Sequence, residues 1–179
     1  GRQTASEPRL QPVILRRHQA GACASAALFP AGGAYRSRLT RHWGPGPGLL
    51  FVMLNPSTAD EARNDPTVAR CEARARATGC GALAVVNLFA FRATDPRALL
   101  AVADPVGPGN DAILAESADR ADQVICAWGN AGRWQGRDAA ALALLRASGR
   151  SLFHLGLSRL GQPMHPLYRP AALAPVRWD

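Results

Sequence analysis

Four short runs of mostly apolar residues, separated by segments of helical character, constrain the fold of this chain more than any other feature. They cover residues 49–54, 82–87, 123–128 and 151–155. A strand that is buried on both faces of a parallel sheet is apolar at consecutive positions rather than at alternate ones. Helices are predicted at 66–77, in a segment ending near 121, and at 137–147. This alternation predicts a single three-layer α/β/α domain around a central, mainly parallel sheet of about four strands.

The N-terminal part of the chain predicts a β extension to that sheet. Residues 1–20 contain prolines and arginines without a clear period, and we expect an arm or an edge strand there. Residues 22–29 and 35–43 predict a hairpin, because the second segment alternates in polarity around a Gly/Pro turn. We expect one domain in the 179 residues, with a core at 21–170 and a tail at 171–179.

All 21 basic residues are arginine, and against 13 acidic residues they give a net charge of +8. A basic surface attracts phosphate groups, and arginine binds them in a bidentate manner. Codon bias and solubility would explain the same composition without any ligand. No run approaches the roughly 18 apolar residues of a membrane-spanning helix, so no membrane partner is expected. The four cysteines are dispersed, which is typical of a reducing compartment. We expect a monomeric, cytoplasmic, nucleoid-associated bacterial protein.

Polar and aromatic side chains gather where the predicted strands end. In open α/β sheets, ligands bind outside the carboxyl ends of the strands. Each residue also has a purely structural explanation, such as a turn for Ser57, packing for Trp128 or an ordinary loop position for His165. The candidates that follow the four strands are Asn55, Pro56, Ser57, Thr58, Asp60, Asp65, Asn87, Phe89, Phe91, Arg92, Trp128, His165 and Tyr168.

Several common chemistries lack their motifs in this chain. The four histidines are scattered without metal-ligand spacing, there is no phosphate-binding loop, and no G-x-S-x-G segment occurs. We therefore expect no metal and no cofactor. Amides, one histidine and aromatic rings suit the recognition of a planar base and the hydrolysis of its bond to a sugar.

A long set of motifs resembles an uncharacterised bacterial family, domain of unknown function 1643. The segments that carry the resemblance are Phe51-Val-Met-Leu-Asn-Pro-Ser-Thr-Ala-Asp60, Asn64-Asp-Pro-Thr67, Val86-Asn-Leu-Phe-Ala-Phe-Arg-Ala-Thr-Asp-Pro96, Gly107-Pro-Gly-Asn-Asp111, Trp128-Gly129 and His165-Pro-Leu-Tyr168. The match covers roughly residues 35 to 170, and the family carries no assigned activity.

In order and spacing, the same motifs are also similar to those of the uracil-DNA glycosylase superfamily, more remotely. Leu54-Asn-Pro-Ser57 resembles its first motif, which implies that Asn55 positions the hydrolytic water. Asn87 matches the strand-end Asn that reads the flipped base, and His165-Pro166 matches the motif whose His assists the departing base. The resemblance implies a glycosylase-like fold and a monofunctional DNA glycosylase.

The chain also departs from the superfamily pattern. Leu167 replaces an expected Ser, which puts one contact to DNA phosphate in doubt, and the cluster cysteine after the middle motif is absent. Ser57 stands where one branch has Gly. Asp60 and Asp65 have no counterpart in the superfamily; they would supply a carboxylate for the water or the cationic sugar, or Asp65 would only cap a helix.

The function predicted from the sequence is an N-glycosidase of DNA repair that hydrolyses the bond of a flipped-out damaged, mismatched or modified base. In this scheme Asn55 orients water, Asn87 reads the base and His165 stabilises the leaving group. Phe89 or Phe91 and Tyr168 stack on the base, and the arginines hold phosphate in a nucleic acid, DNA in preference to RNA. The alternatives are a non-catalytic nucleic-acid-binding module of the same fold, a nucleoside or nucleotide hydrolase, and a divalent-cation hydrolase using Asp60 and Asp65.

Overall fold

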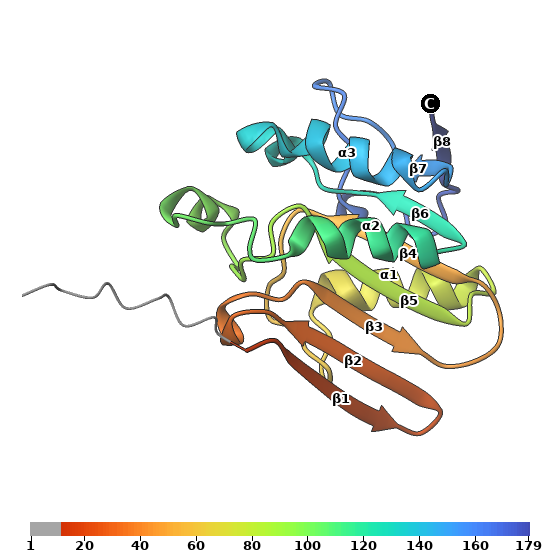
Figure 1. Ribbon diagram of the computed structural model, residues 1–179. Helices are drawn as coiled ribbons and strands as arrows, with labels where there is room; N and C mark the ends of the chain where they lie inside the picture. Colours follow the sequence, from red (N-terminus) through yellow and green to blue (C-terminus); the bar gives the residue numbers. More distant parts are fainter. Residues whose placement is uncertain (1–11) are drawn as a thin grey trace, which may run out of the picture.

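Eight strands form one mixed sheet in the computed structural model, which describes residues 12–179 (Figure 1). Across the sheet their order is β1-β2-β3-β5-β4-β6-β7-β8. In chain order the strands are β1 (Ile14–Ala20), β2 (Cys23–Phe29), β3 (Arg38–His42), β4 (Gly48–Met53), β5 (Ala82–Asn87), β6 (Gln123–Cys126), β7 (Leu152–His154) and β8 (Val176–Trp178).

The pairing of these strands shows that the predicted fold class is wrong. The pairs β4–β5, β4–β6 and β6–β7 are parallel. The pairs β1–β2, β2–β3, β3–β5 and β7–β8 are antiparallel. Antiparallel pairs therefore outnumber parallel ones, and the sheet is not a mainly parallel one of about four strands, as a uracil-DNA glycosylase-like fold would require. Strands β1–β3 extend the same sheet on one side, as the predicted N-terminal β extension does, and β8 adds a further antiparallel strand on the other side.

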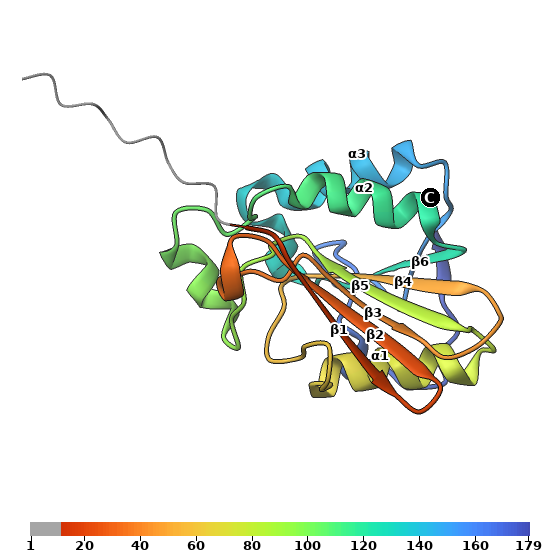
Figure 2. The same ribbon diagram turned by 60° about the horizontal axis from the view of Figure 1, so that its bottom comes forward.

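Three α-helices cover part of this sheet from its two faces (Figure 2). The helices are α1 (Pro66–Ala77), α2 (Asn110–Arg120) and α3 (Arg137–Ala147), with short 3-10 helices η1 (Gly32–Ala34), η2 (Pro96–Ala101), η3 (Asn130–Gly136) and η4 (Pro166–Tyr168). Residues of α1 pack with Phe51 and Met53 of β4, whereas residues of α2 and α3 pack with Leu50 and Val52 of the same strand. Alternation along β4 thus sends its apolar side chains into two separate cores.

Helix α1 begins where the sequence predicts, and its start is determined by two residues. The side chain of Asp65 accepts a hydrogen bond from the backbone N–H of Val68 at 2.9 Å, and Pro66 occupies the first helical position. Such an N-cap satisfies one of the backbone donors that a helix leaves unpaired. The structural explanation for Asp65 is therefore confirmed.

The hairpin prediction is also confirmed, because β2 and β3 pair antiparallel. The edge strand expected within the first 20 residues is present from Ile14, while residues 1–11 lie outside the described part of the chain. Strand β8 falls in the predicted tail and pairs with β7. Within residues 12–179, no helix has both the length and the apolar character needed to cross a membrane.

Candidate functional site

Asn55 lies two residues beyond the end of β4, in the loop that leads to α1. Its side-chain Nδ2 donates to the backbone carbonyls of Ala93 at 2.8 Å and of Pro56 at 3.1 Å. Both partners can only accept, so the orientation of the amide is determined. With its two N–H groups in use, the side chain presents Oδ1 as a fixed acceptor.

An open pocket of about 440 Å³ lies beside Asn55, between the loop after β4 and the loop after β5. Ser57 and Thr58 line it from the first loop, and Phe91, Arg92 and Thr94 line it from the second. The hydroxyls of Ser57 and Thr94 are 3.3 Å apart. The N–H of Ala93 donates to the carbonyl of Pro56 at 2.9 Å, so the two loops are joined directly.

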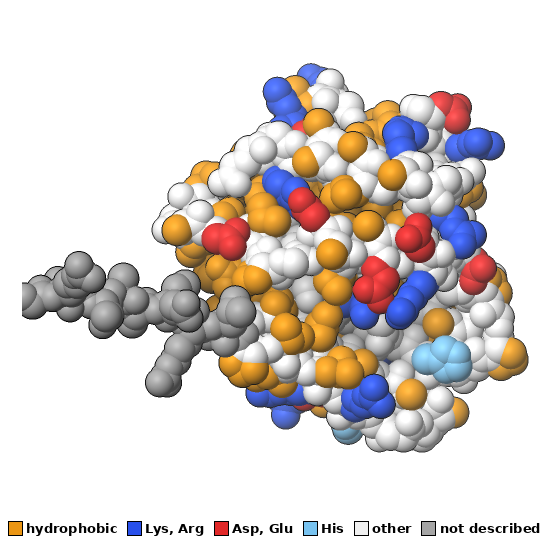
Figure 3. Space-filling model, viewed as in Figure 1, with side chains coloured by type: hydrophobic (Ala, Val, Ile, Leu, Met, Phe, Trp, Pro, Cys, Tyr) orange, Lys and Arg blue, Asp and Glu red, His pale blue; other side chains and the backbone are white. Residues whose placement is uncertain are grey.

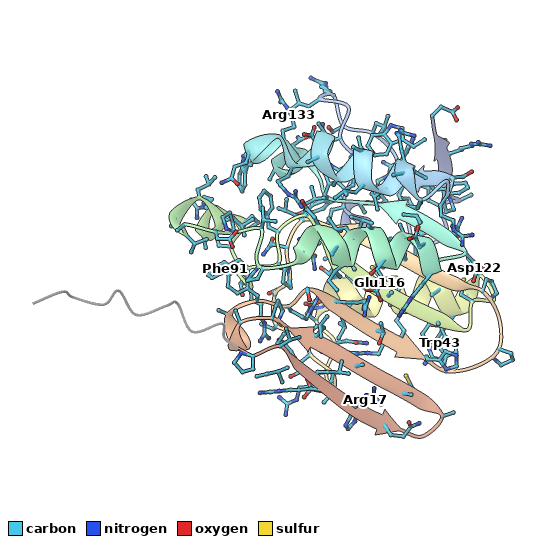
Figure 4. The ribbon with its side chains drawn as sticks, in the orientation of Figure 1. Arg17, Trp43, Phe91, Glu116, Asp122 and Arg133 are labelled. Carbon is cyan, nitrogen blue, oxygen red and sulfur yellow. The ribbon has the colours of Figure 1, made fainter. Side chains whose placement is uncertain are left out.

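Arg92 and Phe91 are held in place at the edge of this pocket. The Arg92 guanidinium donates from Nε to the carbonyl of Ser57 at 3.2 Å and from Nη1 to that of Gly33 at 3.3 Å. Phe91, labelled in Figure 4, lies in the loop after β5. It packs edge-on against Tyr35, with ring centroids 5.6 Å apart. A positioned guanidinium beside three hydroxyls and backbone suits an anion such as a phosphate group.

Asn87 is the last residue of β5 and is 1% exposed. Its Nδ2 is buried without a hydrogen-bond partner, an expensive condition for an amide in a protein interior. Strand alternation places its side chain on the same face of the sheet as Val85, which belongs to the core that α1 covers. Phe89 is equally buried, at 1% exposed, so no ligand reaches its ring without opening of the core.

The backbone just after Asn87 is held by two buried polar side chains that the sequence analysis did not select. Asn110 Nδ2 donates to the carbonyls of Asn87 at 2.9 Å and Leu88 at 3.2 Å. Arg137 Nη2 donates to the Leu88 carbonyl at 3.0 Å and to Asp111 Oδ1 at 2.9 Å. Both residues begin helices, and no periodic signal distinguishes a buried helix-start residue of this kind from a solvent-exposed one.

The carboxylates of Asp60 and Asp65 are both engaged by backbone donors. Asp60 Oδ1 accepts from the N–H groups of Ala62 and Arg63, each at 2.8 Å. Burial acts to raise the pKa of Asp60, but these hydrogen bonds and nearby arginines outweigh it, and the pKa lies below its ordinary value. Asp65 caps α1. Among residues 12–179 there is no cluster of three or more His, Cys, Asp or Glu side chains able to hold a metal ion.

His165 begins the short helix η4, which lies against α1. Its Nδ1 accepts from the N–H of Leu167 at 3.2 Å, so in the neutral ring the proton resides on Nε2. Burial lowers the pKa of His165 below its ordinary value, and the charge of Asp65 acts in the opposite direction. Tyr168 is 77% exposed, with its ring centroid 5.5 Å from that of His165.

Two arginines of α1 hold the segment that follows His165. Arg70 donates to the carbonyl of Arg169 at 2.7 Å, and Arg74 donates to that of Pro170 at 3.1 Å. Hydrogen bonds from α1 to main-chain carbonyls therefore help to hold the segment of η4, and Arg169 in turn donates to the carbonyl of Leu155, just after β7, at 2.7 Å.

Trp128, two residues after the end of β6, is 1% exposed and packs in the core that α2 and α3 cover. Its Nε1 donates to Gln162 Oε1 at 2.9 Å, and Gln162 Nε2 donates in turn to Asp138 at 3.1 Å. Gly132 lies so close to the indole that a Cβ there would clash with it. In this conformation the ring serves packing and is not accessible to a ligand.

Two buried arginines, Arg36 just before β3 and Arg41 within it, fix the loop that carries Asp60. Arg36, 1% exposed, donates from Nη1 to the carbonyl of Ala59 at 2.7 Å. Arg41 Nη2 donates to the carbonyl of Asp60 at 2.6 Å and to Asn64 Oδ1 at 3.0 Å. Burial lowers the pKa of Arg36 to about 10, with Asp65 acting to raise it. Sequence reasoning assigned these arginines only to a strand with alternating polarity.

The structure thus gathers some of the predicted site residues at one pocket and places the others elsewhere. Ser57 and Thr58 line one pocket with Phe91 and Arg92. Asn55 and Pro56 lie behind its wall, where both hydrogen-bond to the backbone of Ala93, which lines the pocket. Asn87 lies beneath the surface on the adjacent strand end, and His165 stands with Asp65 on the side of α1. Trp128 and Phe89 are parts of the core.

These features define a mixed-sheet α/β protein with a polar pocket at the ends of its central strands. Residues 36–167 match the model of a family described as protein of unknown function (DUF1643), and the chain belongs to that family. No curated protein and no solved structure matches the chain.

Proposed function

We propose that the protein is an N-glycosidase that hydrolyses the bond between a base and its sugar, acting on a nucleic acid. In this reaction a water oxygen bonds to the sugar C1′ and the C1′–N bond breaks. The bonding electrons leave with the base, which takes up a proton. The enzyme must hold the water, stabilise the departing base and retain the phosphate-linked sugar.

The observation that carries the proposal is the fixed amide of Asn55. Because both N–H groups of Nδ2 are committed to carbonyls, Oδ1 is left as an oriented acceptor, and we assign to it the positioning of the attacking water. An amide is too weak a base to remove a proton, so its role is orientation. Such a role suits a reaction whose transition state has a cationic sugar and needs a placed, weakly nucleophilic water.

Two further side chains have the polar atoms that the other steps need. His165, neutral because burial lowers its pKa, offers Nε2–H as a donor to the negative charge that develops on the base. Asn87 has an unpaired Nδ2 at the end of β5, where an amide would recognise the edge of a base once the covering loops move. We assign leaving-group stabilisation to the first and base recognition to the second.

The pocket beside Asn55 supplies the contacts for the sugar–phosphate chain. The guanidinium of Arg92 and the hydroxyls of Ser57, Thr58 and Thr94 are suited to phosphate oxygens, and the half-buried ring of Phe91 can stack on a base. This proposal rests on those side chains and on the motif resemblance. It does not rest on a likeness of fold to the uracil-DNA glycosylases.

The experiment is a strand-cleavage assay on labelled single-stranded and duplex oligonucleotides that carry uracil, hypoxanthine, alkylated or hydroxymethylated bases. Each oligonucleotide is incubated with protein and then treated with alkali, which cuts at abasic sites. We expect cleavage of one class by the wild type and a loss of about 100-fold or more in Asn55→Ala. Thr67→Ala, in the first turn of α1, is the matched control, and it should release base at the wild-type rate.

Three outcomes would contradict the proposal. If no base is released from any substrate while salt-sensitive binding persists, the protein is a binding module and not an N-glycosidase. If Asn55→Ala releases base as fast as the wild type, the water is held elsewhere. Activity on free nucleosides with no affinity for oligonucleotides would show that the substrate is a small molecule and not a nucleic acid.

A further inference from the structure

A second cavity lies beside the N-terminal strands and shares no lining residue with the pocket of the proposed active site. It is a groove of about 550 Å³ between α2 and the face of strands β1, β2, β3 and β5 that α2 leaves uncovered. We call it the hairpin groove. No helix of the described chain covers β1 and β2 on this face, as Figures 1 and 2 show.

Strand register explains why the groove is hollow. Arg17 pairs with Ala26, Ala26 with Thr40, and Thr40 with Ala84, so these side chains form one row across four strands on one face. A parallel row contains Ala24, His42 and Ala82. Small side chains form the floor, and neighbouring strands lie about 4.8 Å apart, so the floor spans about 14 Å from β1 to β5.

The walls of the groove carry charge. Arg17 lines the outer side of the groove on β1, and Figure 4 shows it on the far side of β2 and β3 from Glu116 of α2. On the inner side, Arg38 and Arg120 line the groove, and both pair with Glu116, at 3.4 Å and 3.0 Å. Figure 3 shows the same face, with basic and acidic side chains along α2 and a basic one over β1. Arg17 has no ion pair among the residues the structure describes.

The balance of charge identifies the kind of ligand. Four arginines line the groove, Arg17, Arg38, Arg41 and Arg120. Two carboxylates are bonded to lining residues without lining the groove themselves: Glu116 pairs with Arg38 and Arg120, and Asp122 accepts from the N–H of Gly48 at 2.7 Å. The guanidinium of Arg41 points away, to the loop at 60–64 on the other face. One positive charge remains, which complements a monoanion better than a dianion.

We propose that the hairpin groove binds a small aliphatic monocarboxylate. Its apolar body would lie on the alanine floor beside Leu15, Leu28 and Leu50, and its carboxylate would reach Arg17. A mostly apolar cavity of this size with a few placed polar groups is the usual form of a small-molecule site. Arginine also recognises carboxylates by paired hydrogen bonds. The site is separate from the proposed N-glycosidase centre, and neither proposal depends on the other.

The test is isothermal titration calorimetry with octanoate, its methyl ester and octyl phosphate, all below their micelle-forming concentrations. We expect saturable binding of octanoate, with the uncharged ester and the dianionic phosphate weaker. Arg17→Gln should weaken octanoate by about tenfold. Arg16→Gln is the matched control, because Arg16 pairs with Ala27 of the other face and stacks over Phe29. It should change affinity less than twofold.

A filling variant, Ala26→Phe, provides a second check, with circular dichroism and the urea midpoint used to confirm that it folds. It should abolish octanoate binding. The proposal is overturned if octanoate does not bind, if Arg16→Gln weakens it as much as Arg17→Gln, or if the phosphate binds more tightly. It is also overturned if light scattering shows a wild-type dimer that Ala26→Phe dissociates, since the groove would then bind a second copy of the chain.

Discussion

The central strands and the N-terminal hairpin lie in one sheet but differ in how they are held. Every residue of β4 after Gly48 is buried, because α1 covers one face of the strand and α2 and α3 cover the other. In β1, all residues after Ile14 are exposed. The packed centre of the sheet therefore provides most of the stability, and the ends of its strands hold the proposed site. The hairpin half is open, so its side chains are accessible to a ligand.

The largest difference between the two regions should appear in stability. Phe51→Ala removes a ring that is fully buried in β4 and should lower the free energy of unfolding by about 3–5 kcal/mol. Leu15→Ala, on β1 with half of its side chain exposed, should lower it by less than about 1 kcal/mol. Urea unfolding at equilibrium measures both. Equal losses would show that the hairpin is as tightly packed as the centre.

The two regions are joined by buried arginines, and this junction is the next test. Arg36→Met leaves the Ala59 carbonyl without its donor inside the protein and should cost about 1–3 kcal/mol of unfolding free energy. Arg16→Met, on the exposed edge strand, should cost less than about 0.5 kcal/mol. If Arg36→Met is as stable as the wild type, a well-packed apolar chain replaces the ion without loss and the junction is not held by that hydrogen bond.

The smallest effect concerns pH and the edge near α1. The pKa of His165 is lower in the folded protein than its ordinary value of 6.5, so the unfolded chain binds the proton more readily. The unfolding free energy should therefore fall as the pH drops through about 6.5 and below. His165→Asn keeps an acceptor for the Leu167 N–H and should reduce this dependence. Burial also lowers the pKa of His154, so part of the pH dependence should remain in this variant.

An identical pH profile in the wild type and in His165→Asn would contradict this assignment. The effect of His165 is separated by its pH range from that of Asp60. The pKa of Asp60 is lowered by folding, so the stability that Asp60 contributes is present above pH 3.8 and is lost only as the pH falls below that value. Curves recorded between about pH 5 and pH 8 therefore report on the histidines alone among these groups.

The sequence predicted the central strands well because burial on both faces leaves a clear signal. The run at 49–54 and the cap at Asp65 are local features, and β4 and α1 lie where they indicate. The size and direction of the sheet could not be predicted in this way. Strand β1 has no apolar face, and β8 has three residues, so neither shows the periodicity from which strands are predicted.

The candidate site shows the same division. Asn55 and Ser57 were found from a motif at a strand end, and the structure places them beside the pocket. Arg36, Asn110 and Arg137 were missed, because each acts through hydrogen bonds to main-chain carbonyls that are distant in sequence. A buried arginine or asparagine looks the same in the sequence as an exposed one, and only the fold shows which of them is buried.

The most direct test of the account is the release of free base from an oligonucleotide, followed by mass spectrometry in single-turnover conditions. Three proteins are compared: the wild type, Asn55→Ala and Ser57→Ala. We expect base release by the wild type and a loss of about 100-fold or more in Asn55→Ala, with oligonucleotide affinity retained. In Ser57→Ala we expect a weaker affinity without loss of the chemical step. Base release at the wild-type rate by Asn55→Ala, or none by the wild type on any substrate, would contradict the account.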